Sequence, residues 1–123
     1  MKFISTSDAP AAGGHYSQAV VANGFIFVAG QLPVMPDGGM PEGIDAQTRQ
    51  ALSNVDAILT SAGSSLDRIA SATVYVRDIA LWPEINRVYA EMFGSHKPAR
   101  TVTVSPQLHF DALIEIQVVA LVG

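Results

Sequence analysis

The chain has 123 residues, of which 49% are apolar and 15% are charged, so it fits one compact domain and is too apolar for a disordered tail. Eleven acidic and seven basic residues give a net charge of −4, and the basic residues are scattered, which disfavours binding to nucleic acid. There is no cysteine, which excludes disulfides and a thiol nucleophile, and no apolar run approaches the roughly 20 residues that span a bilayer.

The first third of the chain predicts a β-hairpin between two loops. Residues 5–18 are small, polar and turn-forming, and they predict the first loop. Two β-rich runs, Ala19–Ala22 and Phe25–Ala29, flank Asn23-Gly24, a pair that suits the positive φ angles of a tight hairpin turn. Residues 33–43 contain three prolines and three glycines and predict the second loop.

The middle of the chain changes to helical spacing. From Ile44 on, apolar residues recur three and four positions apart, which predicts an amphipathic helix that Gly63 ends. Ile69–Val76 then predicts a strand. A second helix follows, with Pro83 in its first turn and Gly94 at its end. Its apolar stripe consists of Ile85, Val88, Tyr89, Met92 and Phe93.

Two final strands, Arg100–Val104 and Leu113–Val122, complete the order β-β-α-β-α-β-β, which predicts a single α+β domain over residues 1–123. Two helices of this length cover one face of a five- or six-stranded sheet. The opposite face receives Glu115, Gln117, Val119 and Leu121 from the last strand. Because that face is too apolar to stay hydrated, we expect other subunits to cover it.

The histidines and glycines form no recognisable metal or phosphate motif. His15, His96 and His109 lie in three separate predicted loops, without the spacing of metal ligands, so we predict no metal site. The glycine pairs at 13–14 and 38–39 are not followed by Lys-Ser or Lys-Thr, and they are interpreted as turn residues. No G-x-S-x-G sequence supports a serine nucleophile.

Two charged residues stand in apolar strands, and each has two interpretations. Arg100 either points to solvent at a strand end or aims its planar guanidinium into a pocket, where it would bind a carboxylate through two hydrogen bonds. Glu115 is either exposed at a sheet edge or buried, and burial would tune its pKa for handling a water molecule. Tyr16 either anchors the first loop or closes a small pocket, and Asn86 is most simply an exposed helical residue.

Several blocks of residues that are weak singly occur together in one order along the chain. They are Gly14-His15-Tyr16-Ser17-Gln18, Ala29-Gly30-Gln31-Leu32-Pro33-Val34, Gln47-Thr48-Arg49-Gln50-Ala51, Thr73-Val74-Tyr75-Val76-Arg77-Asp78, Ile85-Asn86-Arg87-Val88-Tyr89, Pro98-Ala99-Arg100-Thr101 and Ile114-Glu115-Ile116. In this order and spacing they resemble, essentially from end to end, the RidA family of enamine and imine deaminases, also described as L-PSP endoribonucleases.

The resemblance implies a chorismate-mutase-like subunit that assembles into a homotrimer, with a central barrel of sheets and three sites at the subunit interfaces. It assigns Arg100 to the substrate carboxylate, Glu115 to the attacking water, and Tyr16 and Asn86 to the pocket. The implied reaction is hydrolysis of short 2-imino acids and 2-aminoacrylate-type enamines to 2-oxo acids and ammonia, which clears damaging metabolites. No metal or organic cofactor is expected, because a protonated imine is already a strong electrophile.

Three positions depart from the better-studied family members. His15 replaces a proline, Ala29 replaces a serine, and Val102 replaces a cysteine. Ala29 removes a hydroxyl that could bond the substrate, whereas Val102 can still offer its backbone N–H to a carboxylate. Both count as candidate substrate-binding positions, and the departures leave the preferred substrate side chain open.

Other functions compete with deamination. A regulatory trimer that binds small carboxylates would use Arg100 in the same way, whereas only catalysis needs Glu115 to hold a water molecule. Deamination of a larger amino-acid catabolite would need the same site with a wider pocket. Endoribonuclease activity ranks last, because an acidic chain without a basic stripe is poorly suited to hold RNA. We expect a soluble cytoplasmic protein with no membrane partner.

Overall fold

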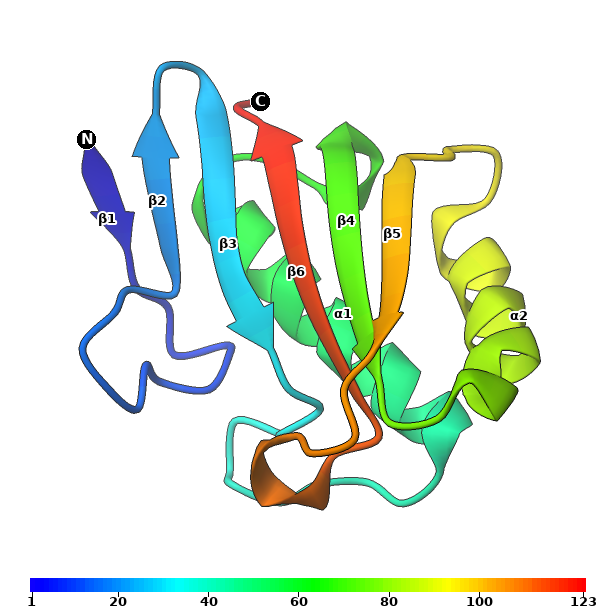
Figure 1. The fold of residues 1–123 in the computed structure, drawn as a ribbon. Helices are drawn as coiled ribbons and strands as arrows, with labels where there is room; N and C mark the ends of the chain where they lie inside the picture. Colours follow the sequence, from blue (N-terminus) through cyan, green and yellow to red (C-terminus); the bar gives the residue numbers. More distant parts are fainter.

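Six strands form one mixed sheet in the order β1-β2-β3-β6-β4-β5 in the computed structural model, which describes residues 1–123 (Figure 1). The strands are β1 (Lys2–Ile4), β2 (Ala19–Ala22), β3 (Phe25–Gln31), β4 (Ile69–Val76), β5 (Ala99–Val104) and β6 (Ile114–Leu121). Only β4 and β5 pair in parallel, while every other neighbouring pair is antiparallel. The α+β class predicted from the sequence is confirmed.

Two helices, α1 (Ile44–Ser61) and α2 (Trp82–Phe93), lie on the same side of the sheet, with α1 behind its centre and α2 beside β5 (Figure 1). Three 3₁₀ turns, η1 (Leu66–Arg68), η2 (Ile79–Leu81) and η3 (His109–Asp111), connect the main elements. Gly63 and Gly94 follow the two helices with φ angles of +79° and +61°, which only glycine adopts without strain. The predicted helix ends are therefore confirmed.

The core lies between the two helices and the face of the sheet that they cover. Successive side chains of a strand point to opposite faces, so alternate residues of β6 reach the core. These are Ile114, Ile116, Val118 and Ala120, each at most 1% exposed. The helices contribute Leu52, Val55, Ile58 and Ile85, which are also fully buried.

The predicted strand order was incomplete at its start, because the structure has an additional strand, β1, before the predicted hairpin. This strand has three residues, too few to show an alternating pattern. It forms because Lys2 pairs with Val21 of β2, a contact between residues far apart in the sequence. In addition, β3 extends to Gln31, beyond the predicted end at Ala29, across a shift of register against β6.

Buried amide side chains hold the loops that border the open face of the sheet. Gln18, 3% exposed, exchanges hydrogen bonds with the main chain of residues 6–10 at distances of 2.7 to 3.5 Å. Asn54 of α1 donates to the carbonyl oxygens of Leu32 and Val34 at 3.0 and 2.8 Å. Because irregular segments cannot satisfy their own backbone groups, these amides fix the loop conformations.

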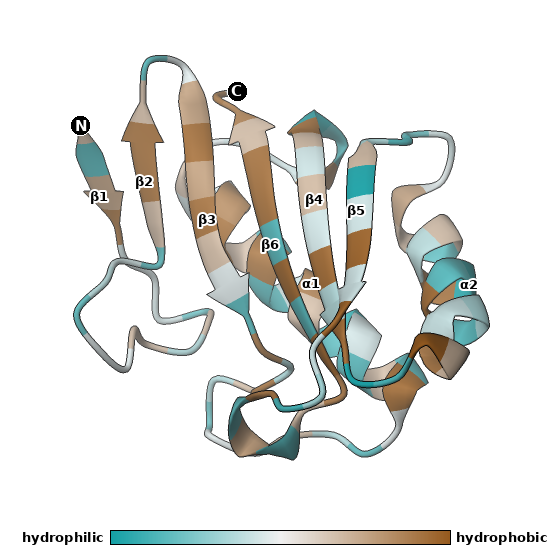
Figure 2. Ribbon diagram, in the orientation of Figure 1, coloured by the Kyte–Doolittle hydropathy of each residue, from teal (hydrophilic) through white to brown (hydrophobic).

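The second face of the sheet carries no helix and remains apolar. Strands β2, β3 and β6 are largely apolar along their length, whereas the surface of α2 carries hydrophilic bands (Figure 2). Phe3 and Phe27 are 67% and 46% exposed, and Phe25 and Leu121 are exposed beside them on paired strands. The uncovered apolar face expected from the sequence is therefore present, and a surface of this kind marks an interaction site.

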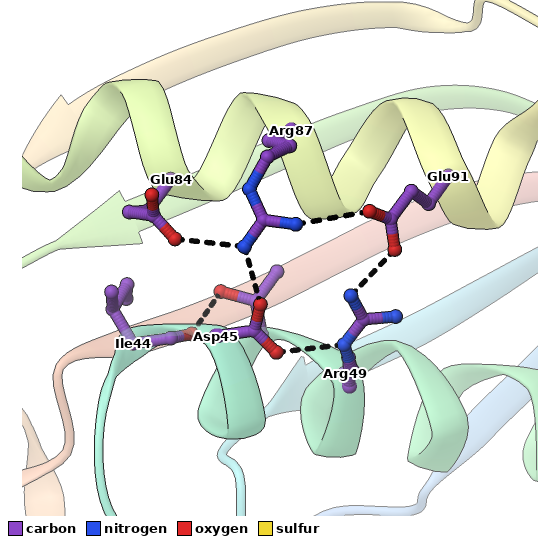
Figure 3. Close-up of polar contacts among 7 residues, drawn as sticks. Ile44, Asp45, Arg49, Glu84, Arg87 and Glu91 are labelled. Carbon is purple, nitrogen blue, oxygen red and sulfur yellow. Dashed lines mark hydrogen bonds and ion pairs between the residues drawn. The ribbon is translucent and has the colours of Figure 1, made fainter.

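Five charged residues tie α2 to α1 (Figure 3). Arg87 of α2 contacts Asp45 of α1 at 2.6 Å, and Arg49 of α1 contacts Glu91 of α2 at 2.5 Å. Glu84 also pairs with Arg87 at 2.9 Å. Hydrogen bonds from Arg49 and then Arg87 hold the pKa of Asp45 below its usual value. The network fixes how α2 sits over the sheet.

We expect Ile58→Ala to reduce the free energy of unfolding by about 2–5 kcal/mol, because it leaves a cavity beneath a fully buried side chain of α1. Thr60→Ala is the matched control, since Thr60 is exposed on the same helix and should change stability by less than about 0.5 kcal/mol. Urea denaturation at one fixed protein concentration measures both. Equal losses in the two variants would contradict this assignment of the core.

Candidate functional site

Arg100 lies on the helix side of β5 and is held against α2. Its register partner on β4 is Ala72, which is buried under the helices, so the arginine side chain points to the same face. Its guanidinium carbon lies 4.4 Å from the ring centre of Trp82 and 4.7 Å from that of Tyr89. Its Nη2 donates to Oδ1 of Asn86 at 3.1 Å. Arg100 is half-buried and lines a hollow, so of its two interpretations the structure favours the one in which the guanidinium faces a pocket.

The charge of Arg100 has no partner of opposite sign within the chain. Arg49, Arg77 and Arg87 each lie within salt-bridge distance of a carboxylate, whereas Arg100 does not. Its only hydrogen-bond partner is the neutral amide of Asn86. A guanidinium held in this way keeps its remaining N–H donors and its full charge for an anion.

A hollow of about 380 Å³ opens beside Arg100, between α2 and the start of β5; we call it the arginine hollow. Asn86, His96, Lys97 and Arg100 supply its polar lining, Tyr89 also lines it, and no carboxylate does. This lining favours a small anionic ligand. Asn86, expected to be simply an exposed helical residue, is exposed but acts as the hydrogen-bond partner of Arg100.

Val102 is two residues farther along β5 on the same face as Arg100. It lines an apolar hollow of about 590 Å³ together with Ile79, Ala80, Trp82 and Pro83. Trp82 therefore lines the apolar hollow and also contacts Arg100, which lines the arginine hollow.

Glu115 lies on the open face of the sheet, on β6, directly over Gly30 of β3. A Cβ atom at position 30 would lie 2.6 Å from Oε2 of Glu115, so the carboxylate occupies the space that any other side chain would need. The glutamate is half-buried, and this burial raises its pKa, while the charge of His109 lowers it. A half-buried carboxylate with a raised pKa suits the transfer of a proton to and from water.

Tyr16 and Ala29 lie on the same open face of the sheet as Glu115. Tyr16 is 56% exposed, and its hydroxyl accepts a hydrogen bond from the backbone N–H of Gly13 at 3.1 Å. It lines a second hollow of about 380 Å³ together with Gly30 and His109; we call this the tyrosine hollow. Ala29 and Tyr16 also line an adjoining depression on the open face. Tyr16 therefore borders a pocket and is not packed into the core.

The candidate residues form two groups that do not meet within one chain. Arg100, Asn86 and Val102 lie between β5 and α2, on the covered side of the sheet. Tyr16 and Glu115 lie on the open side, because β6 turns Glu115 away from the buried Ile114 and Ile116. A site that combines Arg100 with Glu115 needs a second copy of the chain.

Two neighbours of Arg100, Trp82 and Tyr89, were missed by the sequence interpretation, whereas the family resemblance had assigned Asn86 to the pocket. Trp82, Asn86 and Tyr89 occupy positions i, i+4 and i+7 of α2, a spacing that places them on one helix face. Tyr89 was assigned to the apolar stripe alone, and Trp82 was given no role. The spacing could have indicated this shared face, but only the packing of β5 against it reveals Arg100 as the common partner.

The chain brings no group of three His, Cys, Asp or Glu side chains together in a way that could hold a metal ion. His96 uses its Nε2 in a hydrogen bond with the carbonyl oxygen of Ile69 at 2.7 Å, a role within the fold. Neither helix is long and apolar enough to cross a membrane.

The family model described as endoribonuclease L-PSP matches residues 6–122. A RutC family protein of Pyrococcus horikoshii is 45% identical over 119 residues, which cover 95% of this chain and 94% of the relative. The yeast mitochondrial protein Mmf1 is 40% identical over 118 residues, which cover 95% and 81% of the two chains. Because this relative is mitochondrial, the cytoplasmic location of the present chain stays a prediction.

A solved structure also resembles the chain closely. The crystal structure of Escherichia coli TdcF with bound serine superimposes with a TM-score of 0.95 at 36% identity, covering 98% of both chains. The fold is therefore shared over nearly the whole length.

We expect Glu115 to titrate above its usual value of 4.5, because burial penalises its charged form. Its carboxylate, the form that accepts a proton, is thus lost as the pH falls through a value higher than 4.5. His109→Asn should raise the pKa further, since it removes a charge that lowers it. The pKa of Glu115 in wild type and in His109→Asn is measured from its carboxyl ¹³C chemical shift as the pH is varied. Glu115→Gln assigns the signal. A wild-type midpoint below 4.5 would contradict the raised pKa.

Proposed function

The chain belongs to the RidA family, also known as the L-PSP endoribonuclease family, and we propose that it hydrolyses short 2-imino acids and their enamine tautomers to 2-oxo acids and ammonia. The observation that carries this proposal is the arginine at the edge strand, which is held in place without a carboxylate partner. A 2-imino acid supplies the missing carboxylate. Family membership makes this chemistry the first to test.

The proposed reaction begins when Arg100 binds the substrate carboxylate and thereby holds the neighbouring C2 atom in place. Glu115 orients a water molecule and takes one proton as the water oxygen bonds to C2 of the protonated imine. The resulting tetrahedral carbon carries one hydroxyl and one amino group. Glu115 returns the proton to the amino nitrogen, the C–N bond breaks and ammonia leaves, while the Glu115 carboxylate takes the hydroxyl proton to give the 2-oxo acid. Glu115 then releases this proton, which the protonated imine brought in, to the departing ammonia or to water.

We propose that this site forms between copies of the chain in a homotrimer. One copy supplies Arg100, Asn86 and Val102 from β5 and α2, and its neighbour supplies Tyr16, Ala29 and Glu115 from the open face. The proposal is supported by the placement of the two groups on opposite faces of the sheet. The apolar open face, which includes Phe3 and Phe27, is a surface that oligomerisation would cover.

A second candidate function is binding of small carboxylates without turnover. It is favoured by the structure of TdcF, which holds serine, a molecule with an α-carboxylate but no imine. Arg100 serves both functions equally, so Glu115 separates them. RNA cleavage, which the family description names, is disfavoured here by the net charge of −4.

The deaminase proposal is tested with an amino-acid oxidase that generates imines, while semicarbazide traps the imine that survives. Wild-type protein should suppress semicarbazone formation. Arg100→Ala should raise KM about 10- to 100-fold, because it removes a charged hydrogen-bonding group. Glu115→Gln should lower kcat about 100-fold or more, since it removes the proton acceptor.

Arg68→Ala is the matched control for this assay, because Arg68 is exposed, bonds only a carbonyl oxygen and lies outside both residue groups. It should behave as wild type. Binding of pyruvate by wild type without suppression of semicarbazone from any imine would overturn deamination and favour the binding function.

The shared site is tested by mixing two impaired variants and assaying them at an imine concentration below the wild-type KM. Arg100→Ala and Glu115→Gln chains, unfolded and refolded together, should regain activity, because some interfaces then combine an intact Arg100 with an intact Glu115. Either variant refolded alone should stay impaired at the same substrate concentration. Phe27→Glu should weaken an assembly of three times the 13.0 kDa chain mass in light scattering, whereas Thr60→Glu on the helical side should not. No recovered activity in the mixture would contradict a site shared between copies.

A further inference from the structure

Two aromatic rings of α2 hold the guanidinium of Arg100 between them. Its central carbon lies over the ring of Trp82 at 4.4 Å and over that of Tyr89 at 4.7 Å. Both distances are well within the roughly 6 Å at which a cation is attracted to an aromatic face. The side chain of Asn86, between them on the same helix face, accepts a hydrogen bond from the guanidinium.

These three neighbours share one property, which is that none of them carries a negative charge. A carboxylate would fix an arginine more strongly, as Asp45 and Glu91 fix Arg49 elsewhere in the chain, but it would also neutralise the cation. Aromatic rings and an amide restrict the guanidinium and leave its charge uncompensated. The arrangement is thus suited to a cation that must be in place before an anion arrives.

The two rings differ in what their polar groups do. Tyr89 is 6% exposed, and its hydroxyl is buried without a hydrogen-bond partner. Burial raises the pKa of Tyr89 to about 12, so the hydroxyl stays neutral. Because this hydroxyl makes no hydrogen bond, Tyr89 holds the guanidinium of Arg100 through its ring alone.

We propose that Trp82 and Tyr89 are positioning residues, whose rings fix the guanidinium of Arg100 in the orientation that binds the substrate carboxylate while leaving its charge free. The inference rests on the proposed function in that the anion is the carboxylate of the same substrate, but it requires binding and not turnover. Loss of one ring should weaken carboxylate binding by a factor of about 2 to 30, the range of a single cation–π attraction.

Trp82 is the only tryptophan of the chain, so its fluorescence reports on this site without any label. A carboxylate that binds Arg100 changes the charge next to the indole ring. We therefore expect pyruvate, used as the probe, to give a saturable change in tryptophan emission that Arg100→Ala abolishes.

The test compares pyruvate affinity, measured by calorimetry, with KM and kcat for an imine in four variants. Trp82→Leu should raise the Kd and KM about 2- to 30-fold with little change in kcat, and Trp82→Phe should restore most of the affinity because it keeps a ring. Tyr89→Phe keeps the ring and removes only the unpaired hydroxyl, so it should keep or raise Tm. Arg68→Ala, at an exposed residue outside both residue groups, is the control and should change neither constant.

Each outcome bears separately on the two proposals. Wild type that binds pyruvate, with the expected loss in Trp82→Leu, but hydrolyses no imine would overturn deamination and support the positioning role. Wild type that hydrolyses imines, with unchanged Kd and KM in a folded Trp82→Leu variant, would overturn the positioning role alone. A Trp82→Phe variant as weak as Trp82→Leu would also overturn it, because the ring would then not be the cause.

Discussion

The arrangement of the functional side chains depends on a sheet that is covered on one face only. Two helices cover one face of the six-stranded sheet, and no element of the chain covers the other. Strand geometry then divides the functional side chains, because neighbouring residues of a strand point to opposite faces. Arg100 of β5 points toward α2, and Glu115 of β6 points toward the uncovered face. A second copy of the chain would supply both a cover for the apolar face and the missing half of the site.

The arginines show two ways of holding a cation. Arg49 and Arg87 are surrounded by carboxylates, and these ion pairs connect α1 with α2 (Figure 3). Arg100 is held by two rings and an amide, without an acidic partner. The difference is consistent with the proposed role of Arg100, since a structural cation is best neutralised and a cation that binds an anionic ligand is best left charged. The first group fixes α2, which in turn carries the rings that contact Arg100.

On the open face, position is set by small and neutral groups. The absence of a side chain at Gly30 lets the Glu115 carboxylate lie directly over β3, where partial burial raises its pKa. The amide of Gln18 holds the main chain of residues 6–10, just before the turn that carries Tyr16. These contacts keep the carboxylate over β3 and Tyr16 at the tyrosine hollow, with His109 as the charged neighbour of both.

Local signals in the sequence were sufficient for most of the fold. The hairpin at Asn23-Gly24 and both helices, with the glycines that end them, depend on interactions within a few residues, so spacing and turn chemistry predicted them. The strand β1 was not predicted, because a three-residue strand is stabilised only by its pairing with β2.

For the site, the sequence determined the chemistry available, an arginine and a glutamate in apolar strands, and the family resemblance assigned them their expected roles. Whether Arg100 met solvent or a pocket, and whether Glu115 was exposed or buried, stayed open. The tertiary structure decided both, since the surroundings of each side chain come from elements distant in the sequence: α2 for Arg100 and β3 for Glu115. Periodicity indicates which way a residue points, but burial and charge neighbours exist only once strands and helices have packed together.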